Sequence, residues 1–117
     1  MGFYDGFCFL RKKGFQVIPD AFLFTPMKAR VVYSSQSDFC YDIELSDRLS
    51  DAEKIESFIH ECIHFGENYR RFVGHMQELP SAEYERIEFT ITEEARYLSQ
   101  HHHRLVAFLS SRLAKMK

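Results

Sequence analysis

Few cysteines, no long apolar run and no excess of charge characterise this sequence, and each absence argues against a class of protein. The three cysteines among 117 residues are an odd number without CxxC spacing, so we expect reduced thiols rather than a disulfide framework. No apolar run approaches the roughly 20 residues of a transmembrane helix, and the N-terminus lacks the features of a signal peptide. The formal net charge of -2 argues against a general attraction to nucleic acid. Together these features predict a cytoplasmic protein that binds neither membranes nor nucleic acid.

The composition is that of a globular domain. Hydrophobic residues make up 45% of the chain and charged residues 27%, which are ordinary values. A chain of this length fits one domain, so we expect a single domain over residues 1–117. It has room for one core and little more. An active site must therefore lie at the edge of that core, between a sheet and one or two helices.

The first half of the chain predicts a short helix and a small sheet. Residues 4–13 are apolar-rich and precede Gly14, a residue type that often ends helices. Further strand candidates are rich in β-branched or aromatic residues; they are residues 15–18, closed by Pro19, and residues 21–24 and 29–33.

Residues 40–45 carry the clearest strand pattern. Tyr41, Ile43 and Leu45 point to one face, and the residues between them point to the other. Such alternation is typical of a half-exposed strand. We expect this strand at an edge of the sheet.

The second half predicts helices. Ser50 and Glu53 have the spacing of a capping box, and apolar residues then recur at helical spacing up to Gly66, which we expect to end the helix. A second apolar stripe begins after residue 80 and continues close to the C-terminus. β-branched residues within this segment make a break at Thr90 or Thr92 an alternative to one continuous helix. The fold expected is therefore α+β, with a small, mostly antiparallel sheet of three to four strands packed on both helical segments.

The first of these helices contains His60-Glu61-Cys62-Ile63-His64, an HExxH motif. Because four residues span slightly more than one helical turn, both imidazoles project from one face and can bind one metal ion. The pattern is typical of zinc sites in which the histidines are ligands and the glutamate takes a proton from a water that the metal activates. We therefore expect zinc at His60 and His64, with Glu61 as the general base.

A catalytic zinc needs a third protein ligand, and the C-terminal helical segment offers several. Periodicity favours Glu94, which falls three residues after Ile91 and four before Leu98 on the apolar stripe. Glu93 is the alternative, since Tyr97 one turn later would steady it. The remaining candidates are Glu88, His101 and His102.

The triplet His101-His102-His103 lies inside the chain, and a helix would point its three side chains in three directions. At most one of them reaches a metal ion, so a solvated helix surface is the simpler interpretation. Tyr97 is a candidate for substrate binding, as a donor to the oxyanion that forms on a peptide carbonyl.

The order of a short helix, three strands, an HExxH helix and a glutamate-bearing helix resembles the minimal gluzincin fold. This zincin-like fold is that of the ImmA/IrrE-like metallopeptidases and the stand-alone minigluzincins, and the specific match is the HExxH motif of residues 60–64. The resemblance implies zinc as the cofactor, two histidines and one glutamate as ligands, and Glu61 as the base. It also implies that a substrate binds in extended form along an edge strand, which we expect at residues 40–45.

Two functions follow from these observations. The first is a zinc-dependent endopeptidase, active or latent, that hydrolyses a protein or peptide substrate. The second is a catalytically weak or latent zincin-like scaffold that binds a partner protein through its edge strand. Activity with Glu61 intact and with Glu61 replaced separates the two.

Overall fold

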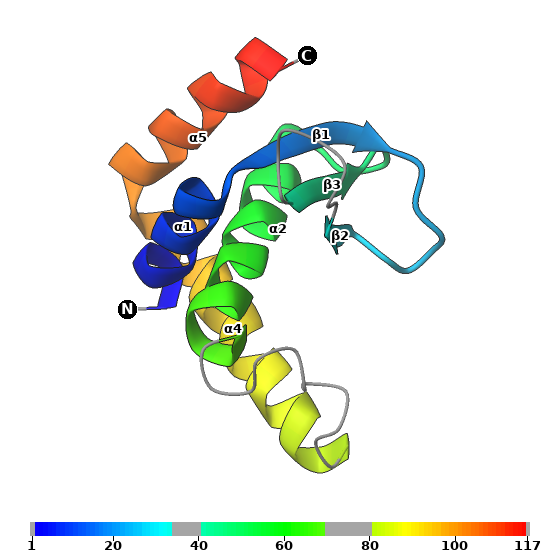
Figure 1. The fold of residues 1–117 in the computed structure, drawn as a ribbon, viewed down its shortest axis with the longest axis vertical. Coiled ribbons are helices and arrows are strands. Elements are labelled where there is room, and N and C mark those ends of the chain that lie inside the picture. Colours follow the sequence, from blue (N-terminus) through cyan, green and yellow to red (C-terminus); the bar gives the residue numbers. More distant parts are fainter. Residues whose placement is uncertain (1, 34–40, 70–80, 117) are drawn as a thin grey trace.

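The computed structural model describes residues 2–33, 41–69 and 81–116, and Figure 1 shows how their helices and strands are arranged. The fold is α+β, as the sequence predicts. Helix α2 lies in the middle, with the sheet on one side and α1 on the other (Figure 1). No helix among the described residues is both long enough and apolar enough to span a membrane. In chain order the elements are α1 (Gly2–Lys13), β1 (Phe15–Ala21), β2 (Ala29–Tyr33), β3 (Tyr41–Ser46), α2 (Asp51–Ile63), the π-helix η1 (His64–Tyr69), α4 (Ser81–His101) and α5 (His103–Met116).

In the described part of the chain, the sheet has three strands in the order β1-β3-β2, so β3 is its central strand. β3 runs parallel to β1 and antiparallel to β2. The sheet is therefore mixed, and the expectation of a mostly antiparallel sheet was wrong. The expectation of an edge strand at residues 40–45 was wrong as well, since their described part is β3. Alternation reports that one face of a strand is covered, but it does not report whether the strand's edges are paired.

The polar residues of β3 are paired across the sheet. Gln16 on β1 donates from its side-chain amide to the Asp42 carboxylate at 2.8 Å. Arg30 on β2 donates from Nε to the Glu44 carboxylate at 2.6 Å. These cross-strand contacts give the polar side chains of β3 hydrogen-bond partners. In the sequence alone, the same alternation of polar and apolar residues resembles that of a solvated edge strand.

Helix α2 covers the apolar face of the sheet. Ile43 and Leu45 of β3 are completely buried and belong to one hydrophobic cluster with Ile55 and Ile59 of α2 and Ile91 of α4. Burial of this apolar surface is the main force that fixes α2 against the sheet and α4 against α2. The HExxH residues span the end of α2 and the start of η1. Cys62 and Ile63 belong to the core, whereas the side chains of His60 and His64 are about one-fifth exposed.

Strand β1 continues through Pro19 instead of closing there, as the sequence predicts it would. Proline lacks the N–H that a ladder needs, which confines it to edge strands and irregularities. β1 is an edge strand, and its register with β3 shifts between Ile18 and Ala21, so Pro19 occupies a place where no ladder bond is lost.

The start of α2 confirms the capping box, whereas its end differs from the prediction. The Ser50 side chain accepts from the Glu53 N–H, and the Glu53 side chain accepts from the Ser50 N–H. The helical path does not stop at Gly66 but continues as η1. Helix α1 lies very close to this path, and Gly6 of α1 permits the contact: a Cβ added at Gly6 would lie 1.7 Å from the Cys62 carbonyl oxygen and 2.8 Å from the Gly66 nitrogen. Gly14, in contrast, ends α1 with a φ of 90°, as expected.

The C-terminal helical segment is confirmed, but its break lies at His102 rather than at Thr90 or Thr92. The Thr90 hydroxyl donates to the Arg86 carbonyl one turn back, so it is satisfied within the helix and does not cap a new one. The His102 ring nitrogen Nδ1 accepts from the Leu105 N–H at 3.2 Å, which places His102 in the N-cap position of α5.

Candidate metal centre

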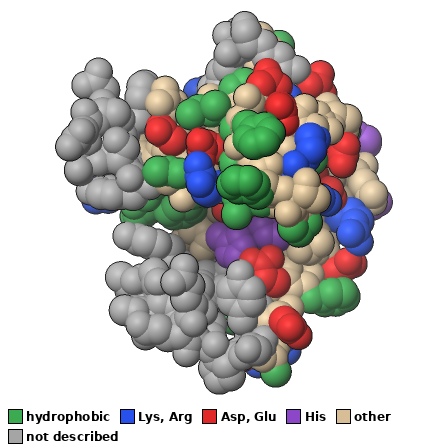
Figure 2. Space-filling model, turned by 90° about the vertical axis from the view of Figure 1, so that its right-hand side faces the viewer, with side chains coloured by type: hydrophobic (Ala, Val, Ile, Leu, Met, Phe, Trp, Pro, Cys, Tyr) green, Lys and Arg blue, Asp and Glu red, His purple; other side chains and the backbone are tan. Residues whose placement is uncertain are grey.

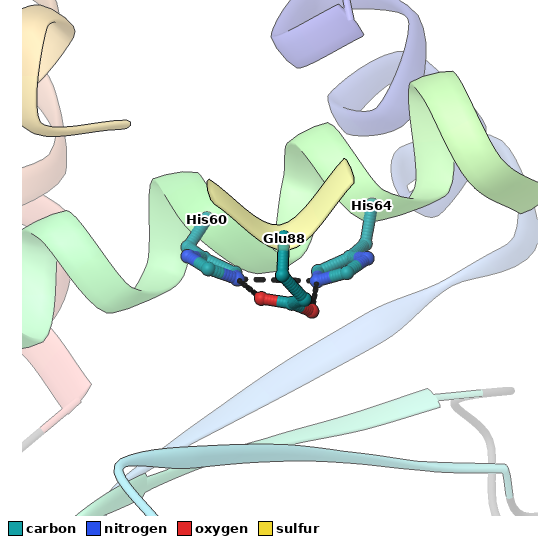
Figure 3. Close-up of side chains that lie close together, drawn as sticks. All are labelled: His60, His64 and Glu88. Atoms are coloured by element: carbon teal, nitrogen blue, oxygen red, sulfur yellow. Dashed lines mark hydrogen bonds and ion pairs between the residues drawn. The ribbon is translucent and has the colours of Figure 1, made fainter. Parts of the chain in front are cut away.

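His60 and His64 lie one turn apart on the helical path through α2 into η1, and their rings project to the same side (Figure 3). Their Nε2 atoms are 3.1 Å apart. Both side chains are about one-fifth exposed. They are therefore accessible from a cleft while most of their surface is packed.

Glu88 of α4 meets both histidines with its carboxylate. Its Oε2 lies 3.1 Å from His60 Nε2, and its Oε1 lies 2.6 Å from His64 Nε2. Figure 3 shows the carboxylate of Glu88 pointing at the gap between the two rings. Among the described residues, these three side chains form the one group of His, Cys, Asp or Glu with metal-ligand spacing, all ligand atoms lying within 4.8 Å of one another.

The spacing of the three side chains fits a small metal ion. Ligand atoms about 2.0–2.1 Å from zinc at tetrahedral angles lie about 3.3 Å from one another. The separations of 3.1, 3.1 and 2.6 Å are close to this value, so small side-chain movements bring the group to ligand geometry. Two imidazoles and one carboxylate are a donor set of catalytic zinc sites and also of non-haem iron sites.

The electrostatics of the group keep Glu88 in the form that binds metals. Hydrogen bonds from His60 and His64 hold the pKa of the Glu88 carboxyl far below its usual range. Burial opposes a charge on His64, but the hydrogen bond to Glu88 and the charges of Glu61 and Glu88 outweigh it, so the pKa of His64 is raised. Without a metal ion, Glu88 therefore accepts hydrogen bonds from the rings.

Glu61 has a different environment from Glu88, although both are carboxylates at the same cleft. Burial raises the pKa of Glu61, and the nearby His64 and His60 oppose this shift without cancelling it. A carboxylate with a raised pKa is a better proton acceptor, which is the property that a general base needs. The sequence prediction of Glu61 as base is consistent with this environment.

The triad opens into a cleft of about 850 Å3. Figure 2 shows histidine side chains at the bottom of a hollow, with hydrophobic side chains on the rim above them and acidic side chains below. β2 and the segment before it form one wall, and the helices form the other. The lining residues are Pro26, Met27, Lys28, Ala29, Arg30, Val31, Ser57, His60, Glu61, His64 and Glu88.

The carboxylate beside the histidines belongs to Glu88, the least favoured of the three glutamate candidates. It belongs neither to Glu94 nor to Glu93. Glu93 is instead half exposed and paired with Arg96 at 2.8 Å. Glu94 belongs neither to the triad nor to the cleft lining.

Periodicity could not separate Glu88 from Glu94. Both border the buried stripe of Ile91, Ala95 and Leu98, on opposite sides about 120° apart, because six residues separate them. They also differ by about 9 Å along the helix axis. The packing of α4 on α2 decides which of the two lies level with the histidines, and no local pattern encodes that alignment.

Tyr97 and the histidine triplet lie away from the cleft lining. Tyr97 is 62% exposed, and its ring stacks on His101 at 4.5 Å between centroids. His101 also contacts the Tyr97 carbonyl through Nδ1, while His102 caps α5. The structure thus brings neither Tyr97 nor the triplet to the HExxH residues, and it gives His102 a structural role that the sequence analysis did not foresee.

No protein-family model, no curated protein and no solved structure matches this chain.

Proposed function

We propose that this chain is a zinc-dependent peptidase in which His60, His64 and Glu88 bind the metal and Glu61 is the general base. The observation that carries the proposal is the convergence of three ligand atoms within 4.8 Å at a cleft that Glu61 also lines. The zincin-like architecture belongs to the same proposal. Zinc is the metal that the HExxH motif favours.

Zinc bound at the triad would supply a Lewis acid for a carbonyl oxygen and would lower the pKa of a water molecule. The chain's own residues then have distinct roles. Glu88, which stays ionised, and the two imidazoles hold the ion. Glu61 takes the proton of the attacking water and passes it to the leaving amine.

An extended peptide suits the cleft because β2, which forms its wall, is an edge strand among the described residues. Hydrogen bonds in an antiparallel pair alternate in direction along each strand. The carbonyl of Lys28 accepts from the N–H of Ser46 on β3, so Lys28 and, two residues on, Arg30 turn their backbone groups toward β3. The N–H and C=O groups of Ala29 and Val31 therefore point away from β3, and both residues line the cleft. An extended peptide can pair with these groups beside the triad.

The substitution Glu61→Gln tests the proposal most simply. The amide preserves the shape of the side chain but cannot accept the proton, so zinc binding should persist while hydrolysis of a mixed peptide substrate falls by about 100- to 10,000-fold. Metal content by elemental analysis and cleavage by mass spectrometry are the two measurements. Wild-type cleavage rates in Glu61→Gln would remove Glu61 from the mechanism, and absence of cleavage by zinc-loaded wild-type protein would contradict the peptidase proposal.

A further inference from the structure

The segment between β1 and β2 presents two phenylalanines to solvent. Phe22 is 81% exposed and Phe24 is 82% exposed, whereas Leu23 between them is 3% exposed. Their rings lie 6.2 Å apart in an edge-to-face arrangement. The buried Leu23 anchors the segment, and the two aromatic rings point outward together.

This loop is held in its conformation by the side chain of Arg48. Its guanidinium donates to the Leu23 carbonyl at 2.8 Å, to the Thr25 hydroxyl at 2.8 Å and to the Met27 carbonyl at 2.9 Å. The Met27 N–H also donates to the Phe24 carbonyl at 2.7 Å. Because the backbone is fixed at these points, the exposure of the rings is a built feature of the fold.

The loop that carries the exposed rings runs on into one wall of the cleft, whose lining begins at Pro26. Met27, which is 44% exposed, lies on the same loop and lines the cleft together with His60 and Glu61. The loop leads directly into β2, so a peptide that pairs with the outer edge of β2 and continues along it passes these side chains. We call Phe22, Phe24 and Met27 the aromatic loop patch.

We propose that the aromatic loop patch binds large apolar side chains of the polypeptide whose backbone lies along β2. The substrate class is accordingly polypeptide segments with a large apolar residue within a few positions of the bond to be cleaved. This inference rests on the proposed function, since it concerns the substrate of the same cleft. Aromatic rings supply the contact area that such recognition needs.

The charges around the patch favour a polypeptide over a lipid surface as its occupant. Asp20 precedes Phe22 in the chain and its side chain is 57% exposed. Asp47, also exposed, donates its N–H to the Ala21 carbonyl at 2.9 Å and so lies beside the same segment. Asp20 is paired with Lys54, and the Arg48 guanidinium lies against the same loop. The charges described beside the rings are therefore mixed and do not form the cluster of basic side chains that draws a protein to an anionic membrane.

The test uses the zinc-loaded Glu61→Gln protein, which should bind peptides without cleaving them. Two fluorescent ten-residue peptides differ only at one central position, which is Phe in one and Ser in the other, and fluorescence anisotropy gives their dissociation constants. We expect the Phe peptide to bind at least about 10-fold more tightly. Phe22→Ser combined with Phe24→Ser should remove this preference and leave binding of the Ser peptide unchanged. Tyr4→Ser, at an exposed aromatic of α1, is the matched control and should keep the preference.

Several outcomes would overturn the inference. These are equal binding of the two peptides, binding of neither, an unchanged preference in the double variant, or equal weakening of both peptides in that variant. Binding to phosphatidylcholine–phosphatidylserine vesicles that the double variant loses would assign the patch to a membrane. Concentration-dependent dimerisation that the double variant loses would assign it to a second copy of the chain.

Cleavage by the protein with Glu61 intact is read separately. A Phe preference in binding without any cleavage would support the role of the aromatic loop patch and contradict the peptidase proposal. Cleavage without a preference for apolar residues would support the peptidase proposal and contradict the role of the patch.

Discussion

The two helices that form the triad differ in how directly their sequences determine it. On the helical path of α2, one turn separates His60 from His64, and a capped helix is enough to bring their Nε2 atoms to 3.1 Å. Glu88 reaches the two histidines only because tertiary packing fixes the position along α2 at which α4 crosses it. The histidine pair on one helical path is a local property of the sequence, whereas the position of Glu88 beside it is a property of the whole fold.

The largest effect that tests this comparison is the loss of zinc affinity on removal of Glu88. We expect Glu88→Ala to weaken zinc binding by more than about 100-fold, since loss of residues that only support ligands already costs 10- to 100-fold. Glu94→Ala and Glu93→Ala, the matched controls on the same helix, should change the affinity less than threefold. Competition with a chromophoric chelator measures all three variants. A larger loss in Glu94→Ala than in Glu88→Ala would mean that α4 packs on α2 at a different height.

The second prediction concerns the contact between α1 and α2, the helix that carries His60. A Cβ at position 6 would lie 1.7 Å from the Cys62 carbonyl oxygen, and no rotamer relieves a clash with backbone. Gly6→Ala should therefore destabilise the protein by about 2–3 kcal/mol, as overpacked cores do. Urea unfolding measures this change, with Cys8→Ala, at an exposed position of α1, as the control.

Gly6→Ala also tests whether the His60–His64 pair depends on tertiary packing. The His60–His64 pair depends on the helix itself, so the folded variant should lose much less zinc affinity than Glu88→Ala does. A loss as large as that of Glu88→Ala would show that even the pair on one helix depends on the packing of α1.

The third prediction concerns the effect of Glu88, on α4, on the protonation of His64. In metal-free protein the pKa of His64 is raised by Glu88 and Glu61 against the effect of burial. In Glu88→Gln the hydrogen bond to a carboxylate and one charge are lost, so the His64 midpoint should fall below its wild-type value. NMR titration of the ring protons measures both proteins in the presence of a chelator. An unchanged midpoint would contradict the contact between His64 and Glu88.

The same shift predicts how stability depends on pH. A group whose folded pKa is raised contributes stability that is fully present below its unfolded pKa, about 6.5 for histidine, and that is lost as pH rises through the folded pKa. The extra stability that His64 gives metal-free wild-type protein over Glu88→Gln should therefore disappear as pH rises through the raised pKa of His64. Urea midpoints across that range measure the difference.

The smallest effect expected is at the junction of α4 and α5. His102→Ala removes the side chain that accepts from the Leu105 N–H and should cost about 1 kcal/mol, as loss of an N-cap does. Asn is a good N-cap residue, so His102→Asn should restore most of the stability. Both variants should keep wild-type zinc affinity, and a loss of affinity would return His102 to the list of ligands.

The fold was predictable from the sequence where patterns are local. The capping box at Ser50, the glycine that ends α1 and the alternation of β3 all encode structure within a few residues, and the structure confirms each of them. The order of the strands, the continuation of the helix through Gly66 and the choice of Glu88 depend on contacts between distant segments. Gly6 illustrates the difference, because the sequence reveals a glycine but not that the backbone of Cys62 and Gly66 occupies the space of a side chain there.

Anomalous diffraction at the zinc absorption edge, from crystals grown with stoichiometric zinc, locates the metal ion and identifies its ligands. We predict one strong peak per chain within about 2.0–2.2 Å of the Nε2 atoms of His60 and His64 and of a Glu88 carboxylate oxygen. A peak bound by Glu93, Glu94 or the histidine triplet in place of Glu88, or no peak between His60 and His64, would contradict this prediction.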